Sequence, residues 1–107
     1  AGTNDADMVL AGNTVRKNKG GLAFALNGRV VGELALPIAG LISTETAEAV
    51  EEKLQALKAA LKEAGISEEI DAFMTLSFVS LPVIPKLRLN TYGIVDVEQQ
   101  TIVPAVF

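Results

Sequence analysis

The first helical pattern in the chain lies near its N-terminus. Asn4 is a residue type that caps helices, and Asp5 and Asp7 would lie in the first turn, where acidic side chains favour the positive end of the helix dipole. Three apolar residues then recur at steps of three and four: Met8, Ala11 and Val15. The pair Gly20-Gly21 is typical of a helix stop. The pattern predicts a helix over about residues 5–18.

A longer and more regular stripe follows in the middle of the chain. Its apolar members are Ala47, Val50, Leu54, Leu57 and Leu61. Ser43 or Thr44 is the expected cap, and Gly65 is the expected end. The stripe predicts an amphipathic helix over about residues 44–64.

Between the two helices, residues 22–36 read as a β-hairpin. Asn27-Gly28 separates two apolar runs, and this dipeptide suits a two-residue turn in which both residues have positive φ. Such a turn places Phe24 opposite Val31. One face then carries Leu22, Phe24, Leu26 and Val31, and the other carries Ala23, Ala25, Val30, Leu34 and Leu36. Neither face is polar, so we expect cover on both: helices over one face and a neighbouring domain over the other.

The C-terminal third has weaker patterns. Residues 67–73 favour a turn or a single helical turn, and Pro82 and Pro85 argue against a long strand or helix around them. Short strands are expected at residues 94–97 and 101–103, with a turn between them. Residues 1–107 are thus expected to form a single α+β domain, in which two main helices pack on a small antiparallel or mixed sheet with a central hairpin.

Composition narrows the function classes. Hydrophobic residues make up 50% of the 107 residues and the mean hydropathy is +0.37, yet no apolar run approaches the roughly 20 residues of a membrane helix. The net charge of −4 disfavours a nucleic-acid partner. The excess of apolar residues indicates a surface that meets another protein surface. The chain does not begin with Met, and we expect it to be processed or a piece of a longer protein.

The sequence contains few residues of the types that act in catalysis. The chain has no His and no Cys, so nucleophile–His pairs are excluded and a transition-metal site would need carboxylates alone. Asp5 and Asp7 are more typical of first-turn helix acids than of an acid–base pair. We therefore expect no catalytic residue, no metal ligand and no cofactor in this chain, and the sequence identifies no substrate-binding residue.

Three blocks of the sequence resemble a known family. They are "GTNDADM" at residues 2–8, "GGLAFALNGRVVGELALPIAGLIS" at residues 20–43, and "DAFMTLSFVSLPVIPKLRLNTYGIVDV" at residues 71–97. Together they are similar to the C-terminal domain of microbial adenine deaminases, in the amidohydrolase superfamily. The resemblance covers about residues 2–104.

The resemblance implies a parent enzyme that hydrolyses adenine to hypoxanthine and ammonia in purine salvage, in the cytoplasm. It also implies a manganese or iron centre in a TIM-like barrel, with ligands upstream of this chain. This domain would be inactive alone. Its expected partner is the barrel of its own polypeptide. Whether it also forms a homo-oligomer is left open, and no nucleic-acid or membrane partner is expected.

Two apolar, proline-interrupted segments are the expected barrel-facing contacts, and their full burial within the domain would contradict this. Their residues are Pro37, Ile38, Leu41, Ile42, Pro82, Val83, Ile84 and Pro85. Pro82 to Pro85 also fits the P-x-x-P pattern of ligands for aromatic grooves, although its apolar setting favours packing. Two alternatives stay open: a free-standing interaction module of the same fold, and a small-molecule-binding domain, for which the sequence has no convergent polar cluster.

Overall fold

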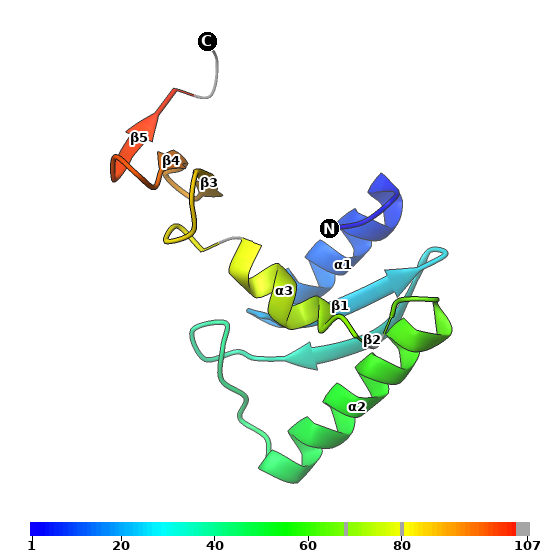
Figure 1. Ribbon diagram of the computed structural model, residues 1–107. Coiled ribbons are helices and arrows are strands. Elements are labelled where there is room, and N and C mark those ends of the chain that lie inside the picture. The colour runs from blue at the N-terminus through cyan, green and yellow to red at the C-terminus, as the bar shows by residue number, and fades with distance from the viewer. Residues whose placement is uncertain (68, 80, 105–107) are drawn as a thin grey trace. The chain divides into compact units, whose positions relative to one another are not determined.

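A computed structural model describes residues 1–67, 69–79 and 81–104 (Figure 1). The chain divides into two compact units, Ala1–Glu69 and Ile70–Phe107, which we call the N-terminal and C-terminal units. Each contains helix and an antiparallel sheet, so the predicted α+β class is confirmed. The sheet is not single, however: one sheet has the order β1-β2 and the other β3-β4-β5. The expectation of one domain over residues 1–107 stays a prediction.

Both predicted helices of the N-terminal unit are present. Helix α1 spans Asp5–Lys17, and the Asn4 cap is confirmed because its Oδ1 accepts a hydrogen bond from the Asp7 amide at 2.8 Å. Helix α2 spans Ala47–Glu63. Its cap is Thr46, whose hydroxyl accepts from the Ala49 amide, so the prediction of Ser43 or Thr44 was wrong.

Two residues account for the ends of α2. The Ser43 hydroxyl accepts from the Glu45 amide and holds a bend before the helix, so the helix begins three residues later than the sequence suggested. Gly65 follows the helix with φ +89°, the left-handed conformation expected at its end.

The hairpin is formed by β1 (Gly21–Leu26) and β2 (Arg29–Ala35). Leu26 pairs with Arg29 as predicted, but a β-bulge interrupts the register between Phe24 and Ala25, so Phe24 pairs with Gly32 instead of Val31. Beyond a one-residue bulge every side chain changes face. Leu34 therefore pairs with Leu22 and lies on the Leu22/Phe24 face, and its predicted place on the other face was wrong.

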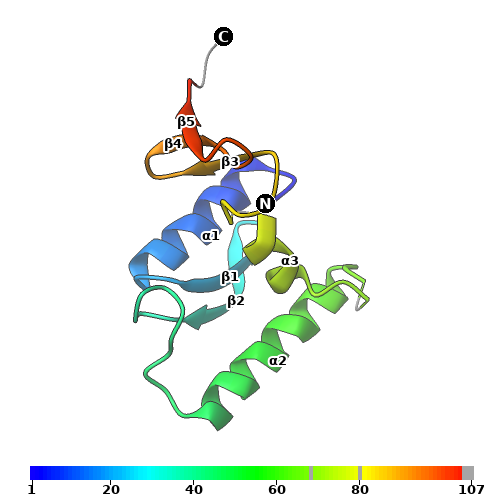
Figure 2. The same ribbon diagram turned by 60° about the vertical axis from the view of Figure 1, so that its left-hand side comes forward.

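The two helices cover opposite faces of the hairpin (Figures 1 and 2). On the Leu34 side, a Cβ at Gly32 would lie 2.8 Å from Cδ2 of Leu57 in α2. On the other side, the Asn18 side chain at the end of α1 donates to the Glu33 carboxylate at 3.0 Å. The expectation that both helices share one face was wrong, because the small residues of β1 and β2 let one helix approach each side.

The core of the N-terminal unit is a leucine cluster. Leu34, Leu57 and Leu61 are 4%, 1% and 8% exposed. Two of them come from the predicted stripe of α2, whose Leu54 and Val50 are half-buried. The stripe prediction is confirmed at its C-terminal end.

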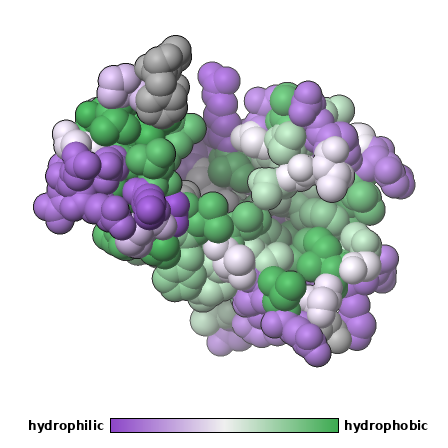
Figure 3. Space-filling model, turned by 45° about the horizontal axis from the view of Figure 1, so that its top comes forward, coloured by the Kyte–Doolittle hydropathy of each residue, from purple (hydrophilic) through white to green (hydrophobic). Residues whose placement is uncertain are grey.

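The C-terminal unit contains α3 (Ala72–Val79), β3 (Leu87–Asn90), β4 (Gly93–Asp96) and β5 (Thr101–Val103). The sequence indicated β4 and β5 to within a residue but not β3, and α3 is two turns where at most one was expected. Asp71 caps α3 by accepting from the Met74 amide at 3.0 Å. None of the described side chains of this unit is buried. Apolar residues reach the surface accordingly (Figure 3).

Substitution of the most buried leucine tests this core. Leu57→Ala should lower the free energy of unfolding by about 2–5 kcal/mol, because it removes a side chain packed between α2 and Gly32. Urea denaturation of the chain measures the change. Glu52→Ala, on the exposed side of the same helix, is the matched control and should change stability by less than about 0.5 kcal/mol. Equal effects would mean that α2 does not pack as described.

Candidate functional site

The eight predicted contact residues fall into two surface segments, one in each unit. In the N-terminal unit, Ile38, Leu41 and Ile42 are 49%, 78% and 58% exposed, and Pro37 is half-buried. In the C-terminal unit Val83 is 72% exposed, Pro82 and Pro85 are exposed, and Ile84 is half-buried. Neither segment is fully buried, so both are accessible to another surface; the contact itself stays a prediction.

Residues 37–42, which we call the PIAGLI loop, form a small closed hairpin. The amide of Ile38 donates to the Ile42 carbonyl at 3.2 Å, and the amides of Leu41 and Ile42 both donate to the Ile38 carbonyl at 3.1 Å. Ala39 and Gly40, between them, have φ +54° and +75°, as a tight turn with two left-handed residues requires. Sequence reasoning interpreted this segment as a connector and missed its regular structure, since Ala is unusual at positive φ.

The PIAGLI loop is fixed to the end of α1 through glycines. A Cβ at Gly20 would lie 2.4 Å from Cα of Gly40 and 2.8 Å from the Leu36 carbonyl oxygen, closer than atoms can pack. The Gly20 carbonyl accepts from the Leu36 amide at 3.1 Å. Gly20 was predicted as a helix stop, and it also leaves room for a second backbone. The sequence carried one sign of this close approach: Gly20 and Gly21 stand together, although a helix end needs only one glycine.

The second segment borders an apolar pocket within the C-terminal unit. This pocket has a volume of about 500 Å³ and is lined by Pro82, Val83, Pro85, Val95, Val97 and Gln100. The Arg88 guanidinium donates to the carbonyls of Pro85 and Leu87, at 3.0 and 2.7 Å, and so ties the proline segment to β3. The lining offers apolar contact and one amide, and no acid–base pair.

Asp7 joins α1 to the turn of the hairpin. Its carboxylate accepts from the Asn4 side-chain amide at 3.0 Å, and from the backbone amides of Asn27 at 3.0 Å and Gly28 at 2.7 Å. The Asn4 hydrogen bond, followed by those of Gly28 and Asn27, lowers the pKa of Asp7 below its ordinary value of 3.8. Asp7 lies in the first turn of α1 as predicted, but its hydrogen bonds to Asn27 and Gly28 follow from no local pattern in the sequence.

We call the hydrogen bonds from Asn4, Asn27 and Gly28 to the Asp7 carboxylate the Asp7 clasp. A pocket of about 390 Å³ lies beside it, lined by residues from the chain's start, β1 and the end of α2. Its polar side chains include Asn4, Asp7 and Asn27, and its apolar walls include Phe24 and Ile66. Asn4 and the Asp7 carboxylate are engaged with each other and with the hairpin turn. The Asp7 carboxylate in this lining is thus engaged in the contact between α1 and the hairpin turn.

The described part of the chain contains no set of side chains that could bind a metal ion. Across residues 1–67, 69–79 and 81–104, no three Asp or Glu side chains gather in a group that could hold a metal ion. In the same residues, no helix is both long and apolar enough to cross a membrane.

Comparison with known proteins decides the family. The family model described as "Adenine deaminase C-terminal domain" matches residues 1–101. The chain belongs to this family. An adenine deaminase of Kosmotoga olearia is 56% identical over 96 residues, which are 90% of this chain and 16% of that protein. Adenine deaminase 2 of Carboxydothermus hydrogenoformans is 45% identical over 104 residues, 97% of this chain and 18% of that protein.

The match confirms the family resemblance seen in the sequence blocks. An adenine deaminase of Methanococcoides burtonii is 47% identical over 102 residues, which are 95% of this chain and 17% of that protein. The chain spans less than a fifth of the length of these curated relatives.

The clasp makes a prediction for pH dependence. Because the pKa of Asp7 is lower in the folded state than in the unfolded chain, its carboxylate stabilises the fold above the unfolded value of 3.8. That contribution is lost as the pH falls through the folded pKa. Asp7→Asn should therefore be less stable than the parent near neutral pH, with a shallower loss of stability below about pH 5.

Urea midpoints measured between pH 7 and pH 2.5 check this prediction. Asp5→Asn is the matched control, since Asp5 lies in the same helical turn and its side chain makes none of the hydrogen bonds to residues 27 and 28. Parallel pH profiles for the parent and Asp7→Asn would contradict the clasp.

Proposed function

We propose that this chain is the C-terminal, non-catalytic part of an enzyme that hydrolyses adenine to hypoxanthine and ammonia in cytoplasmic purine salvage. The observation that carries the proposal is the pattern of the matches: 45–56% identity over 90–97% of this chain, but over only 16–18% of adenine deaminases. The deaminase activity belongs to those relatives by name. Such identity across a whole domain supports the same setting for this chain.

The catalytic metal of the parent enzyme, manganese or iron by family resemblance, does not fit the residues of this chain. The sequence contains no His and no Cys, and the described carboxylates form no cluster. Ligands for a hydrolytic metal and a general base would have to come from the rest of the polypeptide. We therefore place no step of the reaction on this chain.

The proposed role of the domain is to pack on the catalytic barrel or to support assembly of the enzyme. Support comes from the exposed apolar segments, in which Leu41 and Val83 are 78% and 72% exposed. It also comes from the C-terminal unit, where no described side chain is buried. Apolar surface of this kind is stabilised when a neighbouring surface removes it from water.

An activity assay tests the proposal. The full-length protein that carries this chain, incubated with adenine and Mn²⁺, should release ammonia and form hypoxanthine. The 107-residue chain alone should release none under the same conditions. Ammonia release by the isolated chain would overturn its non-catalytic role, and a full-length protein inert toward adenine would overturn the parent reaction. Reading the gene upstream provides the control, since an H-x-H-containing barrel is expected there and a free-standing module would have none.

A further inference from the structure

We infer that the PIAGLI loop is a preformed docking element that inserts Ile38, Leu41 and Ile42 into an apolar recess on the upstream part of its own polypeptide. The inference rests on the proposed function, and it assigns the contact to a specific structure within the domain.

The loop is held in one conformation before any partner arrives. Three backbone hydrogen bonds close it between Ile38, Leu41 and Ile42. The contact of Gly20 with Gly40 fixes it to the end of α1, so its orientation is set by a helix. A loop that is ordered beforehand loses little conformational entropy on binding, and this favours its use as a contact element.

The apolar side chains at the tip of the loop, Ile38, Leu41 and Ile42, are 49%, 78% and 58% exposed. Leu41, at 78% exposed, contrasts with Leu57, at 1%, in the core of the same unit. Ala39 holds a left-handed backbone, which is unfavourable for a residue with a Cβ. A strained turn that presents three apolar side chains to water is not explained by the stability of this unit. It is explained by a surface that covers the tip.

The upstream polypeptide is large enough to reach the tip. The 96 residues matched in the Kosmotoga olearia relative are 16% of it, so that protein has about 600 residues and about 500 outside the match. A compact body of that size has a radius of gyration of roughly 23 Å. Helix α1 has 13 residues and a length of about 20 Å, and the loop lies at its C-terminal end. A body joined before α1 can therefore extend past the loop.

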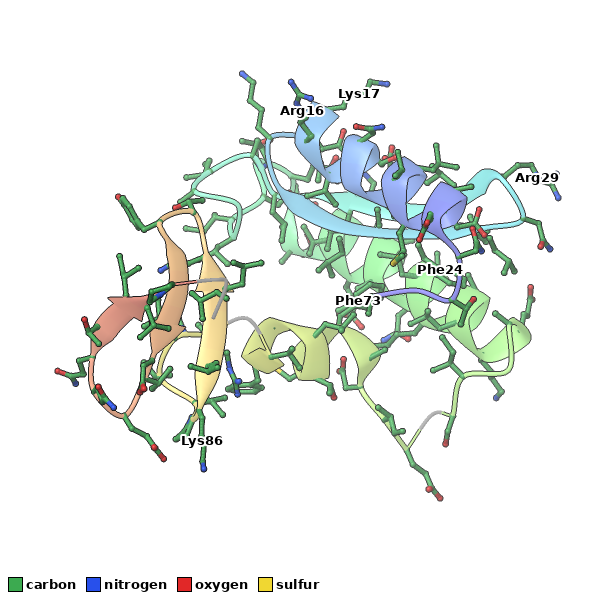
Figure 4. The ribbon with its side chains drawn as sticks, turned by 90° about the horizontal axis from the view of Figure 1, so that it is seen from above. Arg16, Lys17, Phe24, Arg29, Phe73 and Lys86 are labelled. Atoms are coloured by element: carbon green, nitrogen blue, oxygen red, sulfur yellow. The ribbon has the colours of Figure 1, made fainter. Side chains whose placement is uncertain are left out.

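The size of the tip favours an occupant on the same chain over a second copy. Stable interfaces between separate proteins bury about 1,200–2,000 Å² in total, far more than three side chains supply. A covalently attached partner acts at a high effective concentration and needs less contact area. The loop lies beside the basic end of α1, where Arg16 and Lys17 point away from the hairpin (Figure 4). We therefore expect the recess to be apolar with acidic residues at its border.

Cysteine labelling in the full-length protein measures whether the tip is covered. Leu41→Cys should react with a maleimide at least about 100-fold more slowly than Glu52→Cys, read from the labelled peptides by mass spectrometry. Glu52 is the matched control because it lies on the exposed side of α2. This chain has no Cys of its own to interfere. Any smaller ratio would overturn the inference, because Leu41 would then stay open to solvent in the full-length protein.

Photo-crosslinking identifies the occupant. With p-benzoylphenylalanine at position 41 of the full-length protein, irradiation should give a crosslink to an upstream peptide of the same molecule, at a yield independent of protein concentration. A covalent dimer, or no crosslink, would overturn the inference. Neither readout depends on adenine turnover. An active enzyme with an open Leu41 therefore contradicts the docking element alone, whereas an inert protein with a covered Leu41 contradicts only the parent reaction.

Discussion

The packing of a helix on each face of one hairpin is the constraint on which the N-terminal unit depends. A two-stranded hairpin is marginal in water by itself, and this one is apolar on both sides. The bulge after Phe24 brings Leu34 onto the face of Leu22 and Gly32, against which Leu57 of α2 packs. Gly32 leaves the space that Leu57 fills. Without the bulge, Leu34 would face α1, and α2 would lose a partner in its core.

Polar and glycine contacts then set the ends of this arrangement. Asp7 ties the first turn of α1 to the amides of the hairpin turn, and Gly20 admits the PIAGLI loop at the last turn. The helix is thus anchored at both ends to segments about 20 residues away in sequence. The loop inherits its position from this anchoring, which is why a surface segment can be ordered without being buried.

The C-terminal unit presents a different physical situation. The strands β3, β4 and β5 pair in a regular antiparallel register. Among the described residues, however, neither face of this sheet carries a buried side chain, and Leu89 is 73% exposed. A segment of this size rarely holds its own core. Both units therefore combine regular backbone hydrogen bonding with apolar surface that is left uncovered, and this fits a domain whose relatives are several times longer.

The sequence by itself determined the local elements and the chemistry that is excluded. Spacing and caps are short-range signals, so α1, α2, the Asn27-Gly28 turn and the β4–β5 turn could be predicted, and the lack of His and Cys closed most hydrolytic mechanisms. The family was recognisable from three blocks of residues. Only the tertiary structure decided the bulge, the face of each helix, the partner of Asp7 and the closed PIAGLI loop. These depend on contacts between residues distant in sequence, whose energies no local pattern contains.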